Sequence, residues 1–594
     1  MCGISGIYQN KNAKNKKKLE EAVKRMNEIQ KRRGPDDEGI FIDAKNNIAL
    51  GHRRLSIIDL SKAGHQPMEY KDLWITFNGE IYNFLELKKD LEQKGYKFKT
   101  KTDTEVILVL FAEYGEKSFA MLRGMFAFGL WDGKNQKLFL VKDRYGIKPL
   151  YYFSDEEKLI FASTVKAISG SGLIRVEKNP KAMMGFLLFG SVPLPSTTVK
   201  NVLAVPAGHY LKRSANGEEK IIKYYDSLDF FLNKSSDNFD TAVNKTKELL
   251  DRSVNYHLIS DAPLGVFLSG GLDSSALAAL AAEQRKNPIT TISVVFDEEE
   301  FSEKKYQKAV ADKIKSDHRE IKITKEDFLG SFEEIFEAMD QPTIDGVNTF
   351  FVAKAAKEAG VKTVISGLGA DEIFLGYPHF RRAEFLRKIQ QLPKFLKSPL
   401  NLFSLLGDRY SKLNYFLNDD VLNFYLGVRG LFSPQETAKI LDVGLNEVNN
   451  FIYEFNNSIL NPQSSILNSL RPADLLSYLE LQFYLQNQLL KDTDFMSMYH
   501  SIEVRVPFLD HPLVEYVISL PSRIKLGKGV NKALLVESTR DLLPREIFSR
   551  PKMGFTFPFQ KWLQNSSILN SKSSILKIHW SRHWAREVLN KFSL

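Results

Sequence analysis

The chain has one cysteine, no long hydrophobic run and no strong excess of either charge. One cysteine among 594 residues excludes an intrachain disulfide and a cysteine-based zinc cluster. A membrane-spanning helix needs about 18 or more consecutive apolar residues, and the sequence contains no such run. The start of the chain lacks the basic segment, apolar core and cleavage site of an export signal. We therefore expect a cytoplasmic protein with no membrane partner.

The formal net charge of +10 is spread thinly over the chain. Much of it lies between Lys11 and Arg33, where the lysines fall on a polar, helix-like segment. A solvated helix face explains this segment better than a nucleic-acid-binding surface, because no basic groove with interleaved aromatic residues follows it. With 43% apolar and 26% charged residues, the composition is that of an ordinary globular protein, and its length predicts two to four domains.

The position of the cysteine is more informative than its number. Free cysteines are typically buried as small hydrophobic residues, and this is the structural interpretation of Cys2. Its small side chain favours removal of Met1, however, and Cys2 would then carry both a thiol and the α-amine of the chain. Since an α-amine has a pKa of about 8 and a thiol one of about 8.5, the amine can accept the thiol proton near neutral pH. Cys2 is thus a candidate nucleophile with its own base.

Short apolar segments separated by turns, mixed with amphipathic stretches, occupy the first part of the chain. The segments typical of strands are Ile48–Leu50, Leu73–Phe77, Phe126–Leu130, Leu138–Val141 and Leu150–Phe153. Helical periodicity appears at Leu19–Ile29, Phe84–Glu92 and Glu105–Tyr114. This mixture predicts layered sheets with helices on their faces.

Polar clusters lie between these segments, and each has a structural explanation. Asn78-Gly79 is a common tight-turn pair, Asp103 is placed to cap a helix, and Arg54 could form a surface ion pair. Taken with the start of the chain they form a pattern. The segments Cys2-Gly3-Ile4, Arg54-Leu55-Ser56-Ile57, Asn78-Gly79-Glu80 and Thr102-Asp103-Thr104-Glu105 resemble the glutaminase domain of class II (N-terminal-nucleophile) glutamine amidotransferases, and the stretch 143–152 also matches this family.

The resemblance implies a complete site for hydrolysis of the glutamine amide. Cys2 would be the nucleophile, and the Asn78 side chain and the Gly79 backbone N–H would stabilise the oxyanion. Arg54 would hold the α-carboxylate of glutamine by a bidentate pair, and Glu80 and Asp103 would receive its ammonium group.

A second unit begins after a polar, turn-rich passage at 211–240, which we interpret as a linker. Helical periodicity resumes at Thr241–Val254, and an apolar run, a Ser-Gly-Gly turn and an alanine-rich helix then follow between Pro263 and Leu277. A strand, a glycine loop and a helix in this order point backbone N–H groups at an anion. The loop has neither the Gly-Lys-Ser/Thr of a Walker loop nor a Gly-x-Gly-x-x-Gly motif. A purely structural turn with a Ser or Asp cap is the alternative.

The segment Ser269-Gly270-Gly271-Leu272-Asp273-Ser274-Ser275 resembles the pyrophosphate loop of ATP pyrophosphatases, enzymes that split ATP into AMP and pyrophosphate. Further strands at Ile289–Val295 and Val361–Ile365, with helices between them, predict a parallel sheet with its ligand at the carboxyl ends of the strands. The segments 366–377, 340–345, 490–498, 503–510 and 550–555 resemble the asparagine synthetase family, and the resemblance covers almost the whole chain.

This second resemblance implies binding of ATP and Mg²⁺. The residues that would contact ATP are Leu268, Ser269, Gly270, Gly271, Asp273, Ser274, Ser275, Val294, Ser366 and Gly367. Asp273 and Asp371 would hold Mg²⁺, since carboxylates beside phosphates are natural ligands of this ion. Lys552 would act catalytically by neutralising charge that develops on the phosphates.

One residue departs from the family pattern. Many asparagine-forming members have Glu where this chain has Leu368, and that Glu is thought to help form the acyl-adenylate or to accept a proton from ammonia. The leucine leaves the metal ligands and the glycine loop unaffected, so adenylation is expected to survive. Leu368 also favours an alternative acceptor, a carboxylate other than aspartate such as a sugar acid or a peptide. The largely apolar segment 380–470 is expected to be mostly helical.

The sequence therefore predicts a multidomain α/β and α+β protein. A layered α-β-β-α glutaminase domain at 2–210 and the linker at 211–240 precede a parallel-sheet α/β nucleotide-binding domain with extra helices at 241–594. The expected function is glutamine-dependent asparagine synthesis with ATP, Mg²⁺ and small-molecule substrates, by a chain that binds no nucleic acid and for which a homodimer is the candidate assembly. A non-enzymatic scaffold that has kept the fold is the alternative from another class, and the intact Cys2, Asn78, Asp273 and Asp371 argue against it.

Overall fold

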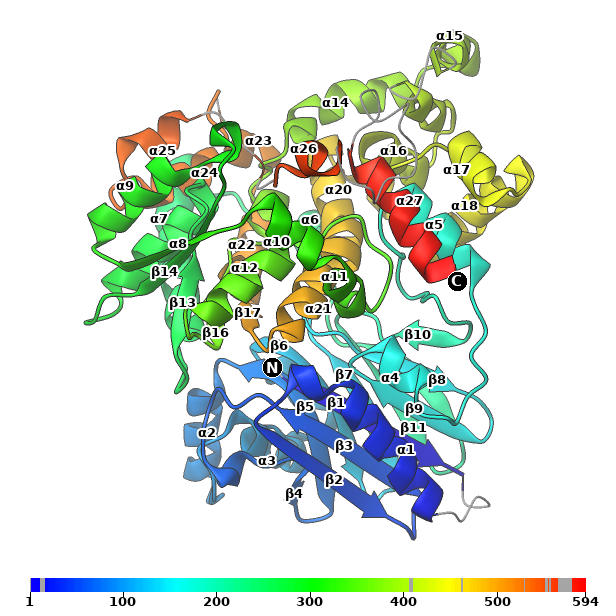
Figure 1. The fold of residues 1–594 in the computed structure, drawn as a ribbon, viewed down its shortest axis with the longest axis vertical. Coiled ribbons are helices and arrows are strands. Elements are labelled where there is room, and N and C mark those ends of the chain that lie inside the picture. Colours follow the sequence, from blue (N-terminus) through cyan, green and yellow to red (C-terminus); the bar gives the residue numbers. More distant parts are fainter. Residues whose placement is uncertain are drawn as a thin grey trace.

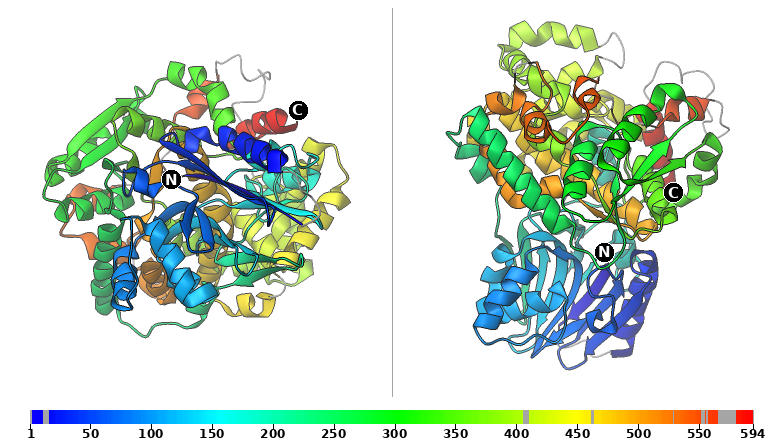
Figure 2. Two further views of the ribbon diagram at one scale, coloured as in Figure 1. Left: turned by 90° about the horizontal axis from the view of Figure 1, so that it is seen from below. Right: turned by 90° about the vertical axis from the view of Figure 1, so that its left-hand side faces the viewer.

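The computed structural model describes residues 2–10, 16–404, 410–460, 463–527, 529–550, 554, 557–564 and 580–593. The molecule has an N-terminal part built on two antiparallel sheets and a C-terminal part built on one parallel sheet with many helices (Figure 1). The right-hand view of Figure 2 shows the two parts stacked one on the other. The predicted fold class is confirmed. Within the described residues, no helix is both long enough and apolar enough to cross a membrane.

Each N-terminal sheet has six strands. The first has the order β10-β8-β9-β1-β3-β2 and the second the order β12-β11-β7-β6-β5-β4. The strands are β1 (Gly3–Gln9), β2 (Asp37–Asp43), β3 (Ile48–Arg54), β4 (Met68–Tyr70), β5 (Leu73–Ile81), β6 (Gly124–Asp132), β7 (Lys137–Lys142), β8 (Tyr151–Ser154), β9 (Lys158–Ala162), β10 (Val202–Ala204), β11 (His209–Ser214) and β12 (Glu219–Lys223).

Helices cover the outer faces of these two sheets. They are α1 (Lys16–Ile29) and α4 (Val165–Ser169) on the first sheet, and α2 (Phe84–Gln93) and α3 (Asp103–Tyr114) on the second. Between the sheets lies an apolar layer that includes Ile4, Leu50 and Leu140. This is the predicted α-β-β-α layering. The charged N-terminal segment belongs to α1, which buries Leu19 and Met26 while the lysines at 16–18 are exposed.

The passage 211–240, interpreted from the sequence as a linker, contributes strands to the N-terminal part and a helix that packs on the C-terminal part. β11 pairs with β7, and β12 adds the edge strand of the second N-terminal sheet. The chain then enters α6 (Leu228–Leu232), which contacts α22 (His511–Ser519) of the C-terminal part. β12 is exposed along most of its length, and charged edge strands of this kind carry little of the apolar alternation that identifies a strand in sequence.

The C-terminal sheet has the order β15-β14-β13-β16-β17, and all of its strands are parallel. They are β13 (Leu264–Phe267), β14 (Thr290–Val295), β15 (Asp317–Lys322), β16 (Thr363–Ile365) and β17 (Glu503–Arg505). Both faces are covered: Val364 packs with α12 (Val347–Glu358), and its neighbour Ile365 packs in a separate cluster with α7 (Phe239–His257) and α8 (Leu272–Glu283).

Helices dominate the rest of the chain. They are α5 (Pro180–Phe189), α9 (Lys304–Ile314), α10 (Lys325–Gly330), α11 (Phe332–Ala338), α13 (Ala370–Ile373), α14 (Pro378–Gln390), α15 (Lys394–Ser404), α16 (Val421–Arg429), α17 (Pro434–Leu441), α18 (Leu445–Ile459), α19 (Ser464–Ser469), α20 (Pro472–Leu479), α21 (Lys491–Tyr499), α23 (Ser522–Leu526), α24 (Ala533–Thr539), α25 (Arg545–Ser549), α26 (Phe559–Gln564) and α27 (Trp580–Ser593). The expectation that the described part of 380–470 is mostly helical is confirmed.

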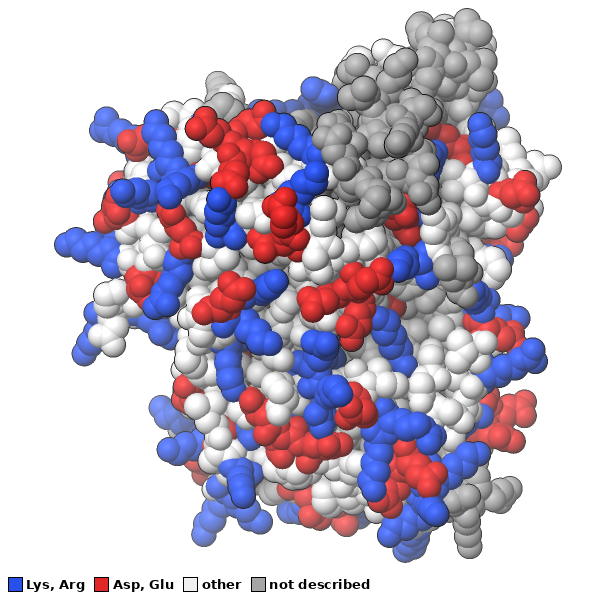
Figure 3. Space-filling model, viewed as in Figure 1, with Lys and Arg blue, Asp and Glu red and all other residues white. Residues whose placement is uncertain are grey.

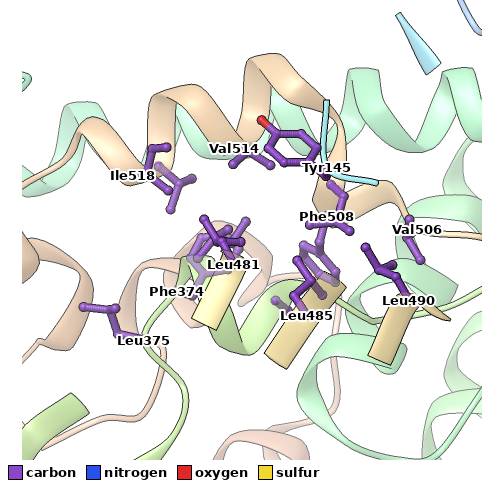
Figure 4. Packing of buried hydrophobic residues seen from close by; sticks show 14 of the residues in the cluster. Tyr145, Phe374, Leu375, Leu481, Leu485, Leu490, Val506, Phe508, Val514 and Ile518 are labelled. Carbon is purple, nitrogen blue, oxygen red and sulfur yellow. The ribbon is translucent and has the colours of Figure 1, made fainter. Parts of the chain in front are cut away.

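A π-helical segment joins α20 to α21. This segment, η7 (Glu480–Leu490), makes one continuous helix of the whole range from α20 to α21. Its Leu481, Leu485 and Leu490 pack among residues of the C-terminal core, including Phe508 and Val514 (Figure 4). π-Helical turns are rare and occur often at functional sites.

Buried ion pairs join the two parts of the molecule. Arg33 donates to both carboxylate oxygens of Asp494 at 2.6 and 3.1 Å, and Arg123 pairs in the same way with Asp510. All four side chains are nearly inaccessible to solvent. Bidentate pairs of this kind fix orientation as well as distance, so the interface between the two parts has a defined geometry.

Lysine, arginine, aspartate and glutamate side chains are interspersed over the face shown in Figure 3. Charges of both signs lie over both parts of the molecule on this face. The distribution agrees with the thin spread of charge seen in the sequence.

Candidate functional sites

Cys2 lies immediately before β1, which pairs with β3 and β9 inside the first sheet. Its backbone nitrogen donates to Asn78 Oδ1 at 2.8 Å, and its carbonyl oxygen accepts from Arg33 Nε at 3.1 Å. The residue is only 7% exposed. The backbone of Cys2 is therefore held both by Asn78 of β5 and by Arg33 at the interface between the two parts.

The groups around the Cys2 thiol have opposite effects on its pKa. Burial raises the pKa of the Cys2 thiol, while a backbone hydrogen bond from Leu55 and the positive charge of Arg54 lower it. A buried thiol is inert until a base removes its proton. Leu55 and Arg54 thus favour the thiolate, while burial disfavours it.

Asn78 carries an unused hydrogen-bond donor beside this thiol. Its Oδ1 is engaged by the Cys2 nitrogen, while its Nδ2 is buried and has no hydrogen-bond partner within the described residues. Buried donors are nearly always paired, so an orphaned one needs a reason. Next to it, a side chain at Gly79 would bring its Cβ within 2.1 Å of the Met125 carbonyl oxygen. Of the two residues expected to form the oxyanion hole, Asn78 contacts Cys2 directly, and Gly79 is its neighbour in the sequence.

The three residues expected to grip glutamine are all buried but have different partners. Asp103 accepts from the backbone N–H of Ile81 at 2.9 Å, which joins the start of α3 to the end of β5. Burial raises the pKa of Asp103 to about 6 and raises the pKa of Glu80 well above its usual range. Arg54 donates to backbone carbonyl oxygens of the following loop at Ile58, Asp59 and Ser61.

Glu80 also faces the C-terminal part. Arg505 of β17 brings its Nη2 within 3.5 Å of Glu80 Oε2, and both of these atoms are buried without a hydrogen bond in the described structure. The carbonyl oxygen of Arg505 accepts from the backbone N–H of Ser366 at 2.8 Å. One residue of β17 therefore lies between a residue expected to bind glutamine and one expected to bind ATP.

The glycine loop between β13 and α8 opens into a cavity of about 270 Å³ at the carboxyl ends of the parallel strands. Its predicted lining residues are Leu268, Ser269, Gly271, Asp273, Ser274, Val294, Ser366, Gly367 and Asp371. Gly270 has φ = +77°, a conformation that favours glycine, and its carbonyl oxygen accepts from Arg550 at 2.7 Å. Ser275 is fully buried behind the loop. Gly270 and Ser275 thus shape the loop and do not line this cavity.

Asp273 and Asp371 converge on one lysine that the sequence reasoning missed. Lys532 Nζ lies 2.7 and 2.6 Å from the two carboxylate oxygens of Asp273, and 2.7 Å from Asp371 Oδ1. Burial opposes the charge of Lys532, but the two carboxylates outweigh it and raise its pKa. A side chain at Gly376 would collide with both Asp371 and Lys532. The two predicted metal ligands therefore do share one site.

The donor set suits Mg²⁺ bound together with a nucleotide. Mg²⁺ is usually held by one or two carboxylates and by phosphate oxygens and water. Two carboxylates from different loops meet here, and no cluster of three or more metal-ligating side chains occurs among the described residues. Asp273 and Asp371 could hold the ion only together with phosphate oxygens. Lys552 lies outside the described residues.

The cavity of about 270 Å³ at the glycine loop is called the nucleotide-type cavity below. A larger cavity of about 880 Å³ adjoins it. Leu368, Asp371 and Tyr377 are among the residues that line both cavities, so the two are adjacent and share part of their wall. Tyr377 donates through its hydroxyl to Glu372 at 2.7 Å, and burial raises the pKa of Glu372 to about 7. Neither Glu372 nor Tyr377 was predicted as a site residue, although both belong to the segment 366–377 that carries the family resemblance.

Two family models match the chain, one in its N-terminal part and one in its C-terminal part. Residues 1–225 match the family model of a glutamine amidotransferase domain, and residues 245–576 match the model described as asparagine synthase. Asparagine synthetase (glutamine-hydrolyzing) 1 of Bacillus subtilis is 33% identical over 95% of this chain and 88% of that protein. Asparagine synthetase (glutamine-hydrolyzing) 3 of the same organism is 30% identical over 97% of this chain and 91% of that protein.

A relative with a different name is similar over the same length. Amidase chry2 of Gibberella zeae is 28% identical over 95% of this chain and 90% of that protein. The matched domains define an enzyme, an ATP-dependent ligase that hydrolyses glutamine. The chain belongs to the asparagine synthase family.

Proposed function

We propose that the chain releases ammonia from glutamine at Cys2 and uses it to amidate a carboxylic acid that it has activated with ATP. The observation that carries this proposal is that the two adjacent cavities of the C-terminal part share Leu368, Asp371 and Tyr377 in their walls. An acid in the larger cavity can present its carboxylate to a nucleotide held by the glycine loop. The test is pyrophosphate release by the purified protein with ATP, ammonia and a panel of acids.

Glutamine hydrolysis follows from the contacts of Cys2. The α-amine of the mature chain takes the thiol proton, and the sulfur attacks the carboxamide carbon. The oxyanion that forms is stabilised by the unused Asn78 Nδ2 and the Gly79 N–H. The protonated α-amine passes its proton to the amide nitrogen, and collapse of the intermediate then expels ammonia and leaves a thioester, which water hydrolyses to glutamate.

Replacement of Asn78 by Asp tests the oxyanion donor separately from the scaffold. In Asn78→Asp, the Oδ1 that accepts from the Cys2 nitrogen is kept, while the Nδ2 donor becomes a second acceptor. We expect kcat for glutamine hydrolysis to fall by about 10²-fold or more, since loss of one such donor costs roughly that much. Glutaminase kinetics measure the fall, and pyrophosphate release with free ammonia serves as the control. An unchanged glutaminase kcat would contradict the assigned role.

Recognition of the glutamine ammonium group is expected to depend on pH. Burial raises the pKa of Asp103 to about 6, so the fraction of ionised carboxylate falls about tenfold for each pH unit below 6. Because the ionised form receives the ammonium group, KM for glutamine should rise as pH falls from 7 to 5. Steady-state glutaminase kinetics across this range measure the effect. Asp103→Asn should show a high KM without this dependence, and an equal slope in both proteins would refute the assignment.

The ligase reaction uses the residues around the glycine loop. A carboxylate oxygen of the acid attacks the α-phosphorus of ATP, and pyrophosphate leaves. Lys532 lies where a positive charge can neutralise phosphate oxygens, and Mg²⁺ held by Asp273 and Asp371 would add Lewis-acid charge when bound. Ammonia then attacks the acyl carbon and AMP departs with the bonding electron pair.

The attacking nitrogen must lose a proton during this last step. Leu368 cannot accept one, although it lines the junction of the two cavities. Glu372 lines the nucleotide-type cavity, and its pKa of about 7, raised by burial, suits a general base near neutral pH. We assign the proton to Glu372, positioned by the Tyr377 hydroxyl.

Two acceptors are supported by different observations. The names of the Bacillus subtilis relatives support aspartate, which would make the product asparagine. Leu368, the size of the larger cavity and the amidase-named relative support a different carboxylic acid. Aspartate-dependent pyrophosphate release, with asparagine as the product, would favour the first acceptor. Release with larger acids alone would favour the second.

A further inference from the structure

The larger cavity has far more room than an amino acid needs. Its volume of about 880 Å³ lies near the upper end of the roughly 300–1,000 Å³ found for pockets that hold drug-sized ligands. A molecule the size of aspartate would fill a small part of it and would leave the remaining wall in contact with water. The cavity is therefore matched to a larger acid, an argument that rests on the proposed function.

Aromatic side chains form much of the wall that faces away from the glycine loop. Tyr425 of α16 and Phe483 and Tyr484 of η7 line the larger cavity but not the nucleotide-type cavity. The guanidinium of Arg429 lies between two rings, with its central carbon 3.7 Å from the Tyr484 centroid and 4.5 Å from the Tyr377 centroid. Rings and stacked guanidinium groups offer flat surfaces for a ring-shaped substrate.

Three cations line the same cavity, and two of them are partly neutralised. Arg429 Nε contacts both carboxylate oxygens of Glu480 at 3.0 and 3.1 Å, and Arg582 pairs with Glu436 at 2.8 Å. The Nη2 of Arg429 is buried and has no hydrogen-bond partner within the described residues. This guanidinium therefore keeps one donor unused, as Asn78 does at the other site.

Lys412 is the third cation, and no carboxylate is paired with it. It lines the larger cavity and has neither an ion pair nor a hydrogen bond in the described part of the chain. Burial, together with the nearby charges of Arg582 and Arg429, lowers the pKa of Lys412 to about 8, although the charge of Glu436 acts in the opposite direction. Such a lysine gains free energy from any anion that enters the cavity beside it.

The carboxylates that line this cavity each have a partner, but Asp492 keeps its buried Oδ1 without a hydrogen bond in the described structure. Asp371 pairs with Lys532, Asp492 accepts from the Thr343 hydroxyl and lies beside Lys491, and Asp345 accepts from the Gly346 N–H. The positive group without a partner, Lys412, is therefore not balanced by a carboxylate within the described wall. The wall formed by Lys412 and the free edge of Arg429 is therefore the part of the cavity that is complementary to a negative charge on the substrate.

We infer that the acceptor is a carboxylic acid of sugar size or larger that carries a second anionic group, bound by Lys412 and the free edge of Arg429. The second group is a phosphate or another carboxylate, and both chemistries match an ammonium and a guanidinium. The reacting carboxylate lies near Leu368, where the two cavities meet. The second anion takes no part in bond making or breaking and serves to orient the acid.

The test uses four acids and the full-length protein. They are glucuronic acid 1-phosphate, galactaric acid, glucuronic acid and aspartate, which offer a phosphate, a second carboxylate on a sugar chain, no second anion and a small diacid. Pyrophosphate release is measured with ATP and ammonia. We expect the highest kcat/KM with one of the first two acids, and which of them is preferred distinguishes phosphate from carboxylate.

Lys412→Met removes the unpaired charge without leaving a carboxylate uncompensated. It should raise KM for the preferred dianionic acid by about 10- to 100-fold, the usual value of a charge-assisted hydrogen bond, and leave KM for glucuronic acid nearly unchanged. Lys412→Arg should retain most of the affinity. Lys439→Met, on the exposed side of α17, is the matched control. Glutamine hydrolysis at the distant Cys2 site reports that each variant is folded.

The outcomes separate the inference from the proposed function. Efficient use of aspartate, or an equal effect of Lys412→Met on all acids, would overturn the inference and leave ATP-dependent amidation intact. No pyrophosphate release with any of the four acids, from a protein that still hydrolyses glutamine, would count against both the inference and acid activation at this site.

Discussion

A Cys2→Ala protein is expected to lose glutamine hydrolysis by at least about 10⁴-fold while it continues to amidate its acid with free ammonia. The loss is large because no other residue can replace the sulfur as the attacking atom, and removal of a catalytic nucleophile typically costs several orders of magnitude. The ligase chemistry has its own cavities in the C-terminal part and needs only ammonia. Paired assays with glutamine and with ammonium chloride measure the two activities.

The variant is expected to fold, because the hydrogen bonds that Cys2 makes with Asn78 and Arg33 use its backbone nitrogen and oxygen. Alanine retains both groups and also allows removal of Met1. A matched protein that keeps Met1 retains the thiol but converts the α-amine into an amide. Full glutaminase activity of that protein would rule out the α-amine as the base, and loss of the ammonia-dependent activity in Cys2→Ala would show that the two sites are not independent.

The sequence predicted the N-terminal layers well where strands are buried on at least one face. β5, β6 and β7 lie between other strands and carry apolar side chains almost throughout, so their positions follow from pattern alone. β15 (Asp317–Lys322) was missed because five of its six residues are ionisable, as its sequence Asp-His-Arg-Glu-Ile-Lys shows. It pairs only with β14 at the sheet edge, where charge protects against pairing with another chain.

Some residues of the two sites could be predicted from short sequence motifs, whereas others are brought to a site only by the fold. The expected residues around Cys2 and the glycine loop lie in short motifs, and the structure brings Asn78 to Cys2 and Asp371 to Asp273 through Lys532. Lys532 could not be found from spacing, because it is 259 positions from Asp273 and sits in a sequence with no marked motif. The larger cavity is built from segments between Phe189 and Arg582, so only the fold could reveal its size or its unpaired Lys412.

An Asp371→Asn protein is expected to release pyrophosphate about 10³-fold more slowly, with unchanged glutamine hydrolysis. Asp273 and Asp371 bring two carboxylates to one place at the glycine loop, where both contact Lys532. One or two carboxylates together with phosphate oxygens are the usual ligands of Mg²⁺. Asparagine is isosteric and can still accept from Lys532, so the variant removes charge and keeps shape. The loss is that expected when charge stabilisation of a phosphoryl transition state is weakened.

The dependence on Mg²⁺ gives this prediction a readout that a structural defect would not produce. If Asp371 holds the ion, the concentration of Mg²⁺ needed for half-maximal pyrophosphate release should rise in Asp371→Asn, and high Mg²⁺ should restore part of the rate. Glu283→Gln, which neutralises an exposed carboxylate of α8, is the matched control and should behave as the native protein. A lower rate with an unchanged Mg²⁺ requirement would refute the metal role and leave Asp371 with a structural role as an ion-pair partner, because a carboxylate that only orients an ammonium has no reason to alter the affinity for a divalent cation.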